Sequence, residues 1–372
     1  MGSFLKTTVA STALFLFAIL FALALGEVAL RVAWTPPSLL STPAFERHEV
    51  YGVAPIPGIT GTRTTPEYTH TFSHTAQGFR GGPDIQPVDV SAHLSPRLLF
   101  LGDSFTYGLG ASDDEIFVNI TAKNLGDVEV LNAGVNGYGQ RDQLAMLDAI
   151  GDRLQPDLVV LMFFWNDLED NLKENRATFE VVDGRVNRTD LEVPSTFDPL
   201  AMRSAPQLEQ PSAGSPFYYV REMIKEGSKG FRYRYFGISE RDITNEAQKA
   251  EAWAVTRELF VAIDLRVREL GSRLLVISIP DHNKVNASAV IKNIDPINYD
   301  IEGELRTTLE TLGIEYIDLL EPMSAAYQAT NSDLYYYADR HLTPLGNQVV
   351  ADAMSDVIGE RLRSSFESAV RQ

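Results

Sequence analysis

The stretch of sequence that decides the fold runs from Leu98 to Phe105 and reads Leu-Leu-Phe-Leu-Gly-Asp-Ser-Phe. Four apolar residues in a row predict a buried strand, and the glycine after them marks its end. A strand that ends in Gly-Asp-Ser and opens toward a helix presents the Ser104 hydroxyl at the carboxyl edge of a sheet. Open α/β sheets place their chemistry at this edge.

Apolar runs and helical spacings alternate along the rest of the chain. The predicted buried strands lie at residues 98–101, 128–131, 157–164, 273–279 and 314–318. The predicted helices lie at residues 114–125, 139–154 and 245–270, and from Thr343 to Leu362. Near-continuous apolar strands are typical of a parallel sheet that is covered on both faces. We therefore expect an α/β fold with a doubly wound, five-stranded parallel sheet sandwiched by helices.

The N-terminus carries an uncharged segment that is long enough to cross a membrane. Residues 7–26 contain no charged side chain, and as a helix they extend about 30 Å, the thickness of a bilayer core. Ala22-Leu23-Ala24 has the spacing of a signal-peptidase site, so a cleaved signal peptide is an alternative, and a buried helix is a third. Because helical spacing continues as far as Trp34, we expect residues 1–35 to form an uncleaved transmembrane anchor. The flanking Lys6 predicts an inside N-terminus and an exported remainder.

Composition divides the rest of the chain. Residues 36–96 are rich in Thr, Pro, Gly and His and predict an irregular lead-in with short strands. Residues 97–372 carry the α/β alternation, interrupted by an insertion at about 175–244 with aromatic side chains between Phe217 and Phe236. We expect this insertion to pack beside the sheet, with its aromatic residues forming local core. Contact with sugar rings or with lipid headgroups is the alternative role for these residues.

The bulk properties exclude several classes of function. A formal net charge of −18 argues against a nucleic-acid partner, because phosphates would be repelled. The absence of cysteine excludes disulfides and cysteine-ligated metal. His70 and His74 have i, i+4 spacing, but their stretch alternates like a strand, so we expect no metal site there. No cofactor is predicted.

Three further segments supply partners for a nucleophilic serine. Gly137 lies in a glycine-rich turn after the second strand, Asn166 follows the third strand, and Asp339-Arg340-His341 precedes the last helix. Taken singly, each has an ordinary explanation as a turn, a helix cap or a solvated pair. Taken together, they favour a functional site, because parallel strands end at one edge of the sheet and bring these side chains to Ser104. Acyl transfer needs a nucleophile, a base, an orienting carboxylate and oxyanion donors, and each role has a candidate.

On these residues the chain resembles the SGNH (GDSL-type) hydrolase family. The resemblance covers about residues 97–170 and 272–362. Its four blocks are Gly-Asp-Ser-Phe at 102–105, Asn-x-Gly-x-x-Gly at 132–137, Asn-Asp at 166–167 and Asp-x-His at 339–341. The N-terminal part is similar to membrane-anchored bacterial members, through Glu27 and Leu30-Arg31 and through Gly-Phe-Arg-Gly at 78–81. The resemblance implies a flavodoxin-like SGNH fold.

The resemblance also implies roles for individual residues. Ser104 would be the nucleophile, His341 its base and Asp339 the acid that orients the base. The backbone N–H groups of Ser104 and Gly137 and the side chain of Asn166 would form the oxyanion hole. Two features depart from the usual pattern: Phe-Trp precedes Asn166 where Gly-x is common, and Asp-x-His replaces Asp-x-x-His. The shorter block is similar to the alginate-acetylation branch of the superfamily.

The expected function is that of a membrane-anchored, exported serine esterase with its catalytic domain on the periplasmic or extracellular side. Its substrate would be an acyl ester or an acylated carbohydrate of the cell envelope, and its membrane partner would be lipid around the N-terminal helix. An O-acetyltransferase of envelope polysaccharide is one alternative. A non-catalytic scaffold of the same fold within a membrane complex is another.

Overall fold

Five parallel strands form the central sheet of the computed structural model, which describes residues 2–82, 86–89, 91, 94–173, 176–194, 196–208, 213–236, 246–285 and 300–370. The strands are β5 (Arg97–Gly102), β6 (Glu129–Gly134), β7 (Leu158–Phe163), β10 (Arg273–Ser278) and β11 (Glu315–Asp318). Their order in the sheet is β11-β10-β7-β5-β6, and each neighbouring pair is parallel. In chain order this is 2-1-3-4-5, the flavodoxin-like doubly wound arrangement. The predicted fold class is confirmed.

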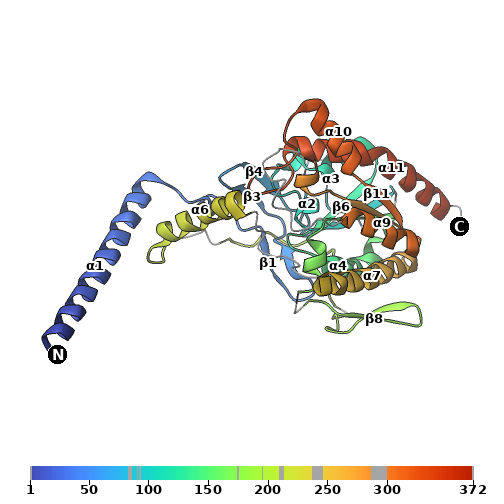
Figure 1. The fold of residues 1–372 in the computed structure, drawn as a ribbon. Helices are drawn as coiled ribbons and strands as arrows, with labels where there is room; N and C mark the ends of the chain where they lie inside the picture. The colour runs from blue at the N-terminus through green and yellow to red at the C-terminus, as the bar shows by residue number, and fades with distance from the viewer. Residues whose placement is uncertain are drawn as a thin grey trace.

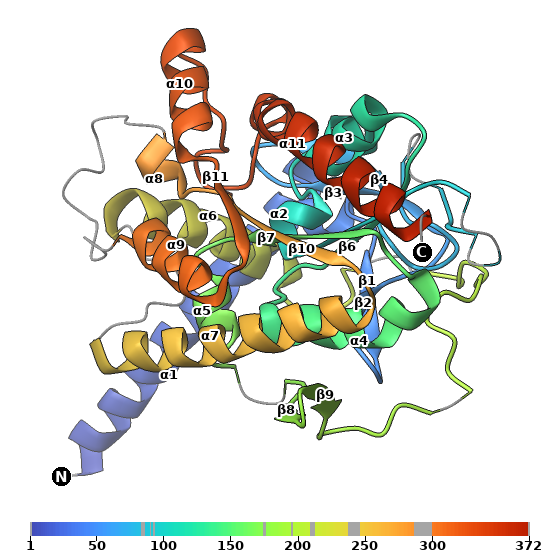
Figure 2. The same cartoon turned by 90° about the vertical axis from the view of Figure 1, so that its right-hand side faces the viewer.

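Helices cover both faces of this sheet (Figure 2). One face carries α3 (Phe117–Leu125) and α11 (Pro344–Val370), and the other carries α4 (Gln140–Leu154), α7 (Glu246–Glu269) and α9 (Ile301–Leu312). Side chains of β5 alternate between the two faces, as the pleat requires. Leu98 and Phe100 pack into the core under α3 and α11, while Leu99 and Leu101 pack into the core under α4 and α7. Burial on both sides explains why every residue of β5 is buried.

Two helical regions differ from the expectation. The segment expected to be helical from residue 114 begins with the 3₁₀ turn η2 (Asp113–Glu115), and Ile116 is extended before α3 starts. Helix α10 (Leu320–Thr330) had no clear sequence signal, because Met323 is its one fully buried residue. A helix that buries so little has no long apolar stripe to recognise. The short elements of the domain are α2 (Ser104–Tyr107), α5 (Asp167–Asp170), α8 (His282–Val285), β8 (Phe179–Val182) and β9 (Arg185–Arg188).

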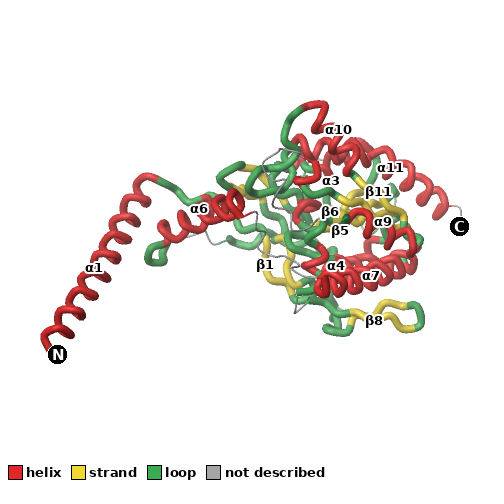
Figure 3. The backbone as a smooth tube through the Cα atoms, viewed as in Figure 1, coloured by secondary structure: helices red, strands yellow, loops and turns green. Residues whose placement is uncertain are grey.

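The lead-in forms two antiparallel hairpins on one side of the domain (Figure 3). After the 3₁₀ turn η1 (Pro37–Leu39), the strands are β1 (Phe45–His48), β2 (Gly52–Pro55), β3 (Thr60–Thr64) and β4 (Thr69–Ser73). Arg80 then forms a bridge with Asn132 of β6, at the edge of the central sheet. The lead-in thereby covers an edge that would otherwise expose unpaired backbone groups.

Helix α1 (Gly2–Ala33) is continuous and projects away from the rest of the protein (Figure 1). Its segment Ser11–Ala33 has a mean hydropathy of 2.5 and is long enough to cross a membrane, although a signal sequence near the N-terminus meets the same criteria. Helix α6 (Tyr218–Phe236) packs against its C-terminal end rather than against the sheet. There the carboxylate of Glu27 accepts the backbone N–H of Val220 at 3.0 Å.

Candidate active site

Ser104 lies where β5 ends and a short helix begins. β5 ends at Gly102, where an added Cβ would lie 2.1 Å from Oγ1 of Thr106, so glycine alone fits this close approach. Asp103 caps α2, and its carboxylate accepts the backbone N–H of Phe105 at 2.8 Å. Ser104 is therefore the first residue of a helix that starts at the carboxyl edge of the sheet.

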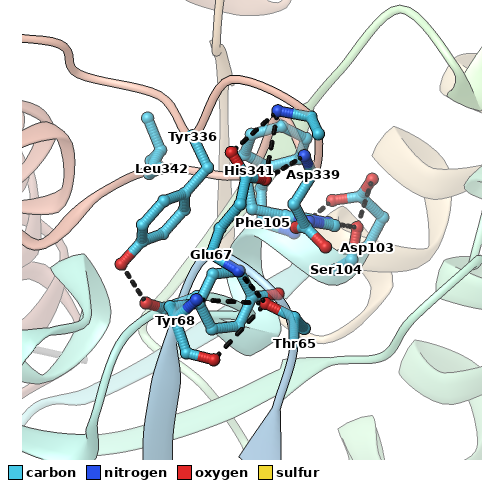
Figure 4. Close-up of polar contacts among 12 residues, drawn as sticks. Thr65, Glu67, Tyr68, Asp103, Ser104, Phe105, Tyr336, Asp339, His341 and Leu342 are labelled. Atoms are coloured by element: carbon cyan, nitrogen blue, oxygen red, sulfur yellow. Dashed lines mark hydrogen bonds and ion pairs between the residues drawn. The ribbon is translucent and has the colours of Figure 1, made fainter. Parts of the chain in front are cut away.

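His341 and Asp339 reach Ser104 from the loop before α11 (Figure 4). Nε2 of His341 lies 2.8 Å from Oγ of Ser104. Nδ1 of the same ring is hydrogen-bonded to Oδ1 of Asp339. Because an ionised carboxylate can only accept, Nδ1 carries the ring proton and Nε2 accepts from the Ser104 hydroxyl. The serine, the imidazole and the carboxylate form one hydrogen-bonded chain, which is the geometry of a catalytic triad.

The backbone of this loop accommodates the short Asp-x-His spacing. Arg340 has a φ of 67°, in the left-handed region that non-glycine residues rarely adopt. Its N–H donates to the carbonyl of Tyr336 at 3.2 Å, and the N–H of Tyr336 donates to the carbonyl of His341 at 2.9 Å. This tight turn reverses the chain between Asp339 and His341, so the two side chains meet although they are only two residues apart.

Two carboxyl groups beside Ser104 have opposite pKa shifts. Burial raises the pKa of Asp339, but the charge and hydrogen bond of His341 and the charge of Arg63 outweigh it and lower the pKa to about 2. Burial raises the pKa of Asp103 to about 6, and the N–H of Phe105 and the charge of His341 reduce that rise only in part. Asp339 is therefore an anion at neutral and mildly acidic pH. Asp103, in contrast, gains or loses its proton near pH 6.

A second buried carboxyl group lies next to Asp103. Burial, followed by the negative charge of Asp103, raises the pKa of Asp167 well above its ordinary value. Nε2 of Gln140 and the N–H of Phe164 donate to Oδ2 of Asp167 at 2.7 and 3.2 Å. These contacts fix the turn after β7 and with it the position of Asn166.

The two other candidate oxyanion residues lie at the same sheet edge, without a direct bond to the triad-like chain. The side chain of Asn166 lies near Asp103 and acts to lower the pKa of that carboxyl group, and its Nδ2 donates to Oδ2 of Asp170 at 3.3 Å. Gly137 has a φ of 78° in the turn after β6, with no atom within 4 Å of where a Cβ would stand. Among the described residues, no hydrogen bond joins Gly137 or Asn166 to Ser104.

The ring of Phe105 packs against the imidazole of His341. The ring of Phe105 lies 5.1 Å from His341 and 4.2 Å from Phe164, centroid to centroid. The indole of Trp165, the bulky residue before Asn166, is fixed by a hydrogen bond, in which its Nε1 donates to Oδ2 of Asp281 at 3.0 Å. His282 is buried beside Asp281.

The lead-in contacts α2 through buried side chains that the sequence analysis did not assign to the site. Arg80, from the Gly-Phe-Arg-Gly element, is fully buried, pairs with Asp113 at 2.8 Å and lies over the ring of Tyr107. Nε2 of His74 is 2.8 Å from the hydroxyl of Tyr107, and its Nδ1 is 2.7 Å from the carbonyl of Ile56. Burial lowers the pKa of His74 to about 3, so this ring stays neutral. His74 thus has a structural role in holding α2.

Glu67, in the turn between β3 and β4, is another contact that the sequence analysis missed. Its carboxylate accepts backbone N–H groups from Ala338 and Asp339. About 270 residues separate the partners, so no local pattern signals this contact. Beside it lies a cavity of about 440 Å³, whose lining includes Arg63, Glu67, Lys225 and Asp339.

Comparisons with known proteins match the chain to families of hydrolases and acyltransferases. Residues 100–224 match the GDSL-like lipase/acylhydrolase family, and residues 238–371 match the SGNH hydrolase-like domain of the acetyltransferase AlgX. The two matches adjoin and together cover most of the chain. Both matched regions resemble SGNH (GDSL-type) hydrolase domains, and this resemblance supports an ester hydrolase or acyltransferase. No curated protein sequence matches it.

Solved structures resemble the chain at low sequence identity. The acetyl xylan esterase AlAXEase is 15% identical, with a TM-score of 0.40, and the match covers 70% of this chain and 99% of that one. A GDSL-family lipolytic protein from Veillonella parvula is 11% identical, with a TM-score of 0.41 and coverages of 71% and 98%. An acetylxylan esterase from Geobacillus stearothermophilus is 14% identical, with a TM-score of 0.39 and coverages of 71% and 94%. The family assignment rests on the two sequence matches.

Proposed function

We propose that this chain is a serine esterase that forms an acyl-enzyme intermediate on Ser104. The observation that carries the proposal is the hydrogen-bonded chain from Oγ of Ser104 through His341 to Asp339. Asp339 stays ionised because its pKa is about 2. It can therefore hold the ring in the tautomer that accepts the serine proton and stabilise the imidazolium that forms.

The proposed reaction uses these groups in order. Oγ of Ser104 attacks the carbonyl carbon of the ester while its proton moves to Nε2 of His341. The negative charge that develops on the carbonyl oxygen is stabilised by the N–H groups of Ser104 and Gly137 and the amide of Asn166. Collapse of the tetrahedral intermediate releases the alcohol, which takes the proton from His341. A water molecule or a sugar hydroxyl then attacks the acyl-serine by the same route.

The substrate and the location are part of the same proposal. We propose an acylated carbohydrate of the cell envelope as substrate, because the second half of the chain matches a domain of an acetyltransferase. The projecting apolar helix supports attachment to a membrane, and Lys6 at its short N-terminal flank favours export of the domain. These features are those of a single-pass protein with its site outside the cytoplasm.

An O-acetyltransferase is the second candidate function. The match of residues 238–371 to an acetyltransferase domain favours it, and that region contains both Asp339 and His341. The chemistry on the enzyme is the same in both cases. Only the group that attacks the acyl-serine differs, and it is water for an esterase and a sugar hydroxyl for a transferase.

A fluorophosphonate probe tests the active serine directly. The purified full chain in detergent micelles should become labelled at Ser104, which peptide mass spectrometry identifies, and Ser104→Ala should remain unlabelled. Absence of labelling at Ser104 in the wild-type chain would favour the non-catalytic scaffold instead.

An acceptor assay separates the two enzyme functions. Release of p-nitrophenol from p-nitrophenyl acetate is measured with and without an added oligosaccharide. For an esterase, the acetyl group should appear as free acetate at the same rate in both samples. Transfer of the acetyl group to the oligosaccharide, with faster release of p-nitrophenol, would assign the transferase.

A further inference from the structure

We propose that Glu67 is a positioning residue, which holds Asp339 against His341 and so raises the reactivity of Ser104. This inference rests on the proposed function. Glu67 belongs to the lead-in, outside the segments that match the family. Both carboxylate oxygens lie 3.0 Å from the N–H nitrogen of Ala338, and Oε2 lies 2.7 Å from that of Asp339.

The loop needs such a support because its backbone is strained. Arg340 has a left-handed conformation, which is unfavourable for a residue with a Cβ. The two N–H groups before it both donate to the Glu67 carboxylate, and a pair of backbone donors suits an anionic oxygen. Hydrogen bonds from N–H groups to a carboxylate are about twice as strong as neutral ones. Glu67 therefore stabilises the loop conformation in which Asp339 faces His341.

The turn that carries Glu67 is itself held in place. The N–H of Thr65 donates to the carbonyl of Tyr68 at 2.9 Å, and Oγ1 of Thr65 accepts the N–H of Tyr68 at 3.2 Å. The ring of Tyr68 packs on Tyr336 with a centroid distance of 4.5 Å, and the Tyr336 hydroxyl donates to the carbonyl of Gly110 at 2.9 Å. The turn and the loop thus face each other through two independent contacts (Figure 4).

The charge of Glu67 is compatible with an ionised Asp339. Arg63, on the strand that precedes the turn, lines the cavity beside both carboxylates. Its positive charge is among the causes that lower the pKa of Asp339. Tyr68 also lies close to Asp339, and burial, followed by the charge of Asp339, raises the pKa of its hydroxyl. The positive charge of Arg63 therefore offsets the negative charge of Asp339 on the side of the loop that faces Glu67.

The rate of fluorophosphonate labelling measures this effect without knowledge of the substrate. In the full chain in detergent micelles, Glu67→Ala should slow labelling of Ser104 about tenfold, as expected for the loss of about 1.4 kcal/mol of stabilisation. Glu67→Gln should slow it less, because the amide oxygen still accepts one N–H. Glu180→Ala is the matched control, since Glu180 is an exposed acid on β8, and it should label at the wild-type rate.

A double variant shows whether Glu67 acts through Asp339. If it does, Glu67→Ala should have no further effect in the Asp339→Ala background, since the two substitutions remove one unit. An equal additional slowing in that background would overturn the inference, and so would a wild-type rate for Glu67→Ala alone. Failure of the wild-type chain to label at Ser104 would instead reject the proposed function, and this inference with it.

Discussion

At the scale of residues, the two carboxyl groups beside Ser104 are chemically identical, but their surroundings shift their pKa values in opposite directions. Asp339 is hydrogen-bonded to the imidazole of His341 and lies near the charge of Arg63, and these two groups keep it ionised despite burial. Asp103 is buried without a comparable partner, and its pKa rises to about 6. Opposite shifts in neighbouring carboxyl groups are typical of sites that carry out acid–base chemistry. Each residue supports a separate prediction.

Ser104→Ala should reduce ester hydrolysis by a factor on the order of 10⁴–10⁶, because it removes the proposed nucleophile. His341→Ala should have a similar effect, and the double variant should be little worse, since the two groups act together. Asp339→Ala should be milder. Initial rates on p-nitrophenyl acetate give these values, with circular dichroism to verify folding. Near wild-type activity of Ser104→Ala would contradict the assignment.

Asp103→Asn should make stability less dependent on pH. The unfolded chain loses the Asp103 proton near its ordinary pKa of 3.8, whereas the folded chain holds it to about pH 6. Stability of the wild-type chain should therefore fall as the pH rises between these values, by up to about 3 kcal/mol from this group. Asn keeps the cap on α2 and cannot ionise. Urea unfolding measures the free energy of unfolding of both chains at pH 4.5 and 7.5. Relative to the wild type, the variant should be more stable at pH 7.5 than at pH 4.5. The same difference in free energy at both pH values would refute this prediction.

At the scale of elements, the position of Ser104 depends on how closely α2 approaches β6. Gly134, the last residue of β6, faces the backbone of α2. A Cβ at this position would lie 2.4 Å from the N of Tyr107 and 2.6 Å from the carbonyl carbon of Thr106. Both atoms belong to the backbone, so the short helix itself would have to move. We therefore expect the reactivity of Ser104 to depend on Gly134, a residue that has no chemical function of its own.

Gly134→Ala should lower the free energy of unfolding by about 1–3 kcal/mol, the usual cost of overpacking. It should also slow the labelling of Ser104, because α2 is displaced. Gly227→Ala in α6 is the control, since nothing lies within 4 Å of its added Cβ and alanine favours helix. Urea unfolding and probe kinetics of both variants test this. Equal stability of Gly134→Ala and wild type would show that α2 can shift at no cost.

At the scale of the whole molecule, the lead-in connects an apolar helix to the candidate site. α1 projects outward (Figure 1), and the lead-in then supplies Arg80 under α2 and Glu67 against the loop of Asp339. Helix α6 packs on the end of α1, where Arg31 lies over the ring of Tyr219. The segment that would lead out of the membrane is thus also part of the support of the candidate site.

Single cysteines test the membrane attachment, because the chain has none of its own. A fluorophore on Leu20→Cys in α1 should be quenched by nitroxide-labelled lipid when the full chain is in vesicles. The same fluorophore on Val181→Cys, an exposed position on β8, should be quenched by aqueous iodide. Iodide quenching at both positions would exclude an inserted helix. Mass spectrometry of the mature protein should find the intact N-terminus, whereas a start near Leu25 would mean that α1 is a signal peptide.

The sequence by itself determined the five strands, their parallel arrangement and the residues proposed for catalysis, because each of these has a local signature. Apolar runs mark buried strands, and short motifs mark the ends where Ser104 and His341 lie. The tertiary structure alone decided the contact of Glu67 with Asp339, the left-handed turn at Arg340 and the raised pKa of Asp103. These depend on burial and on groups far apart in the chain, and such long-range energies leave no pattern in neighbouring residues.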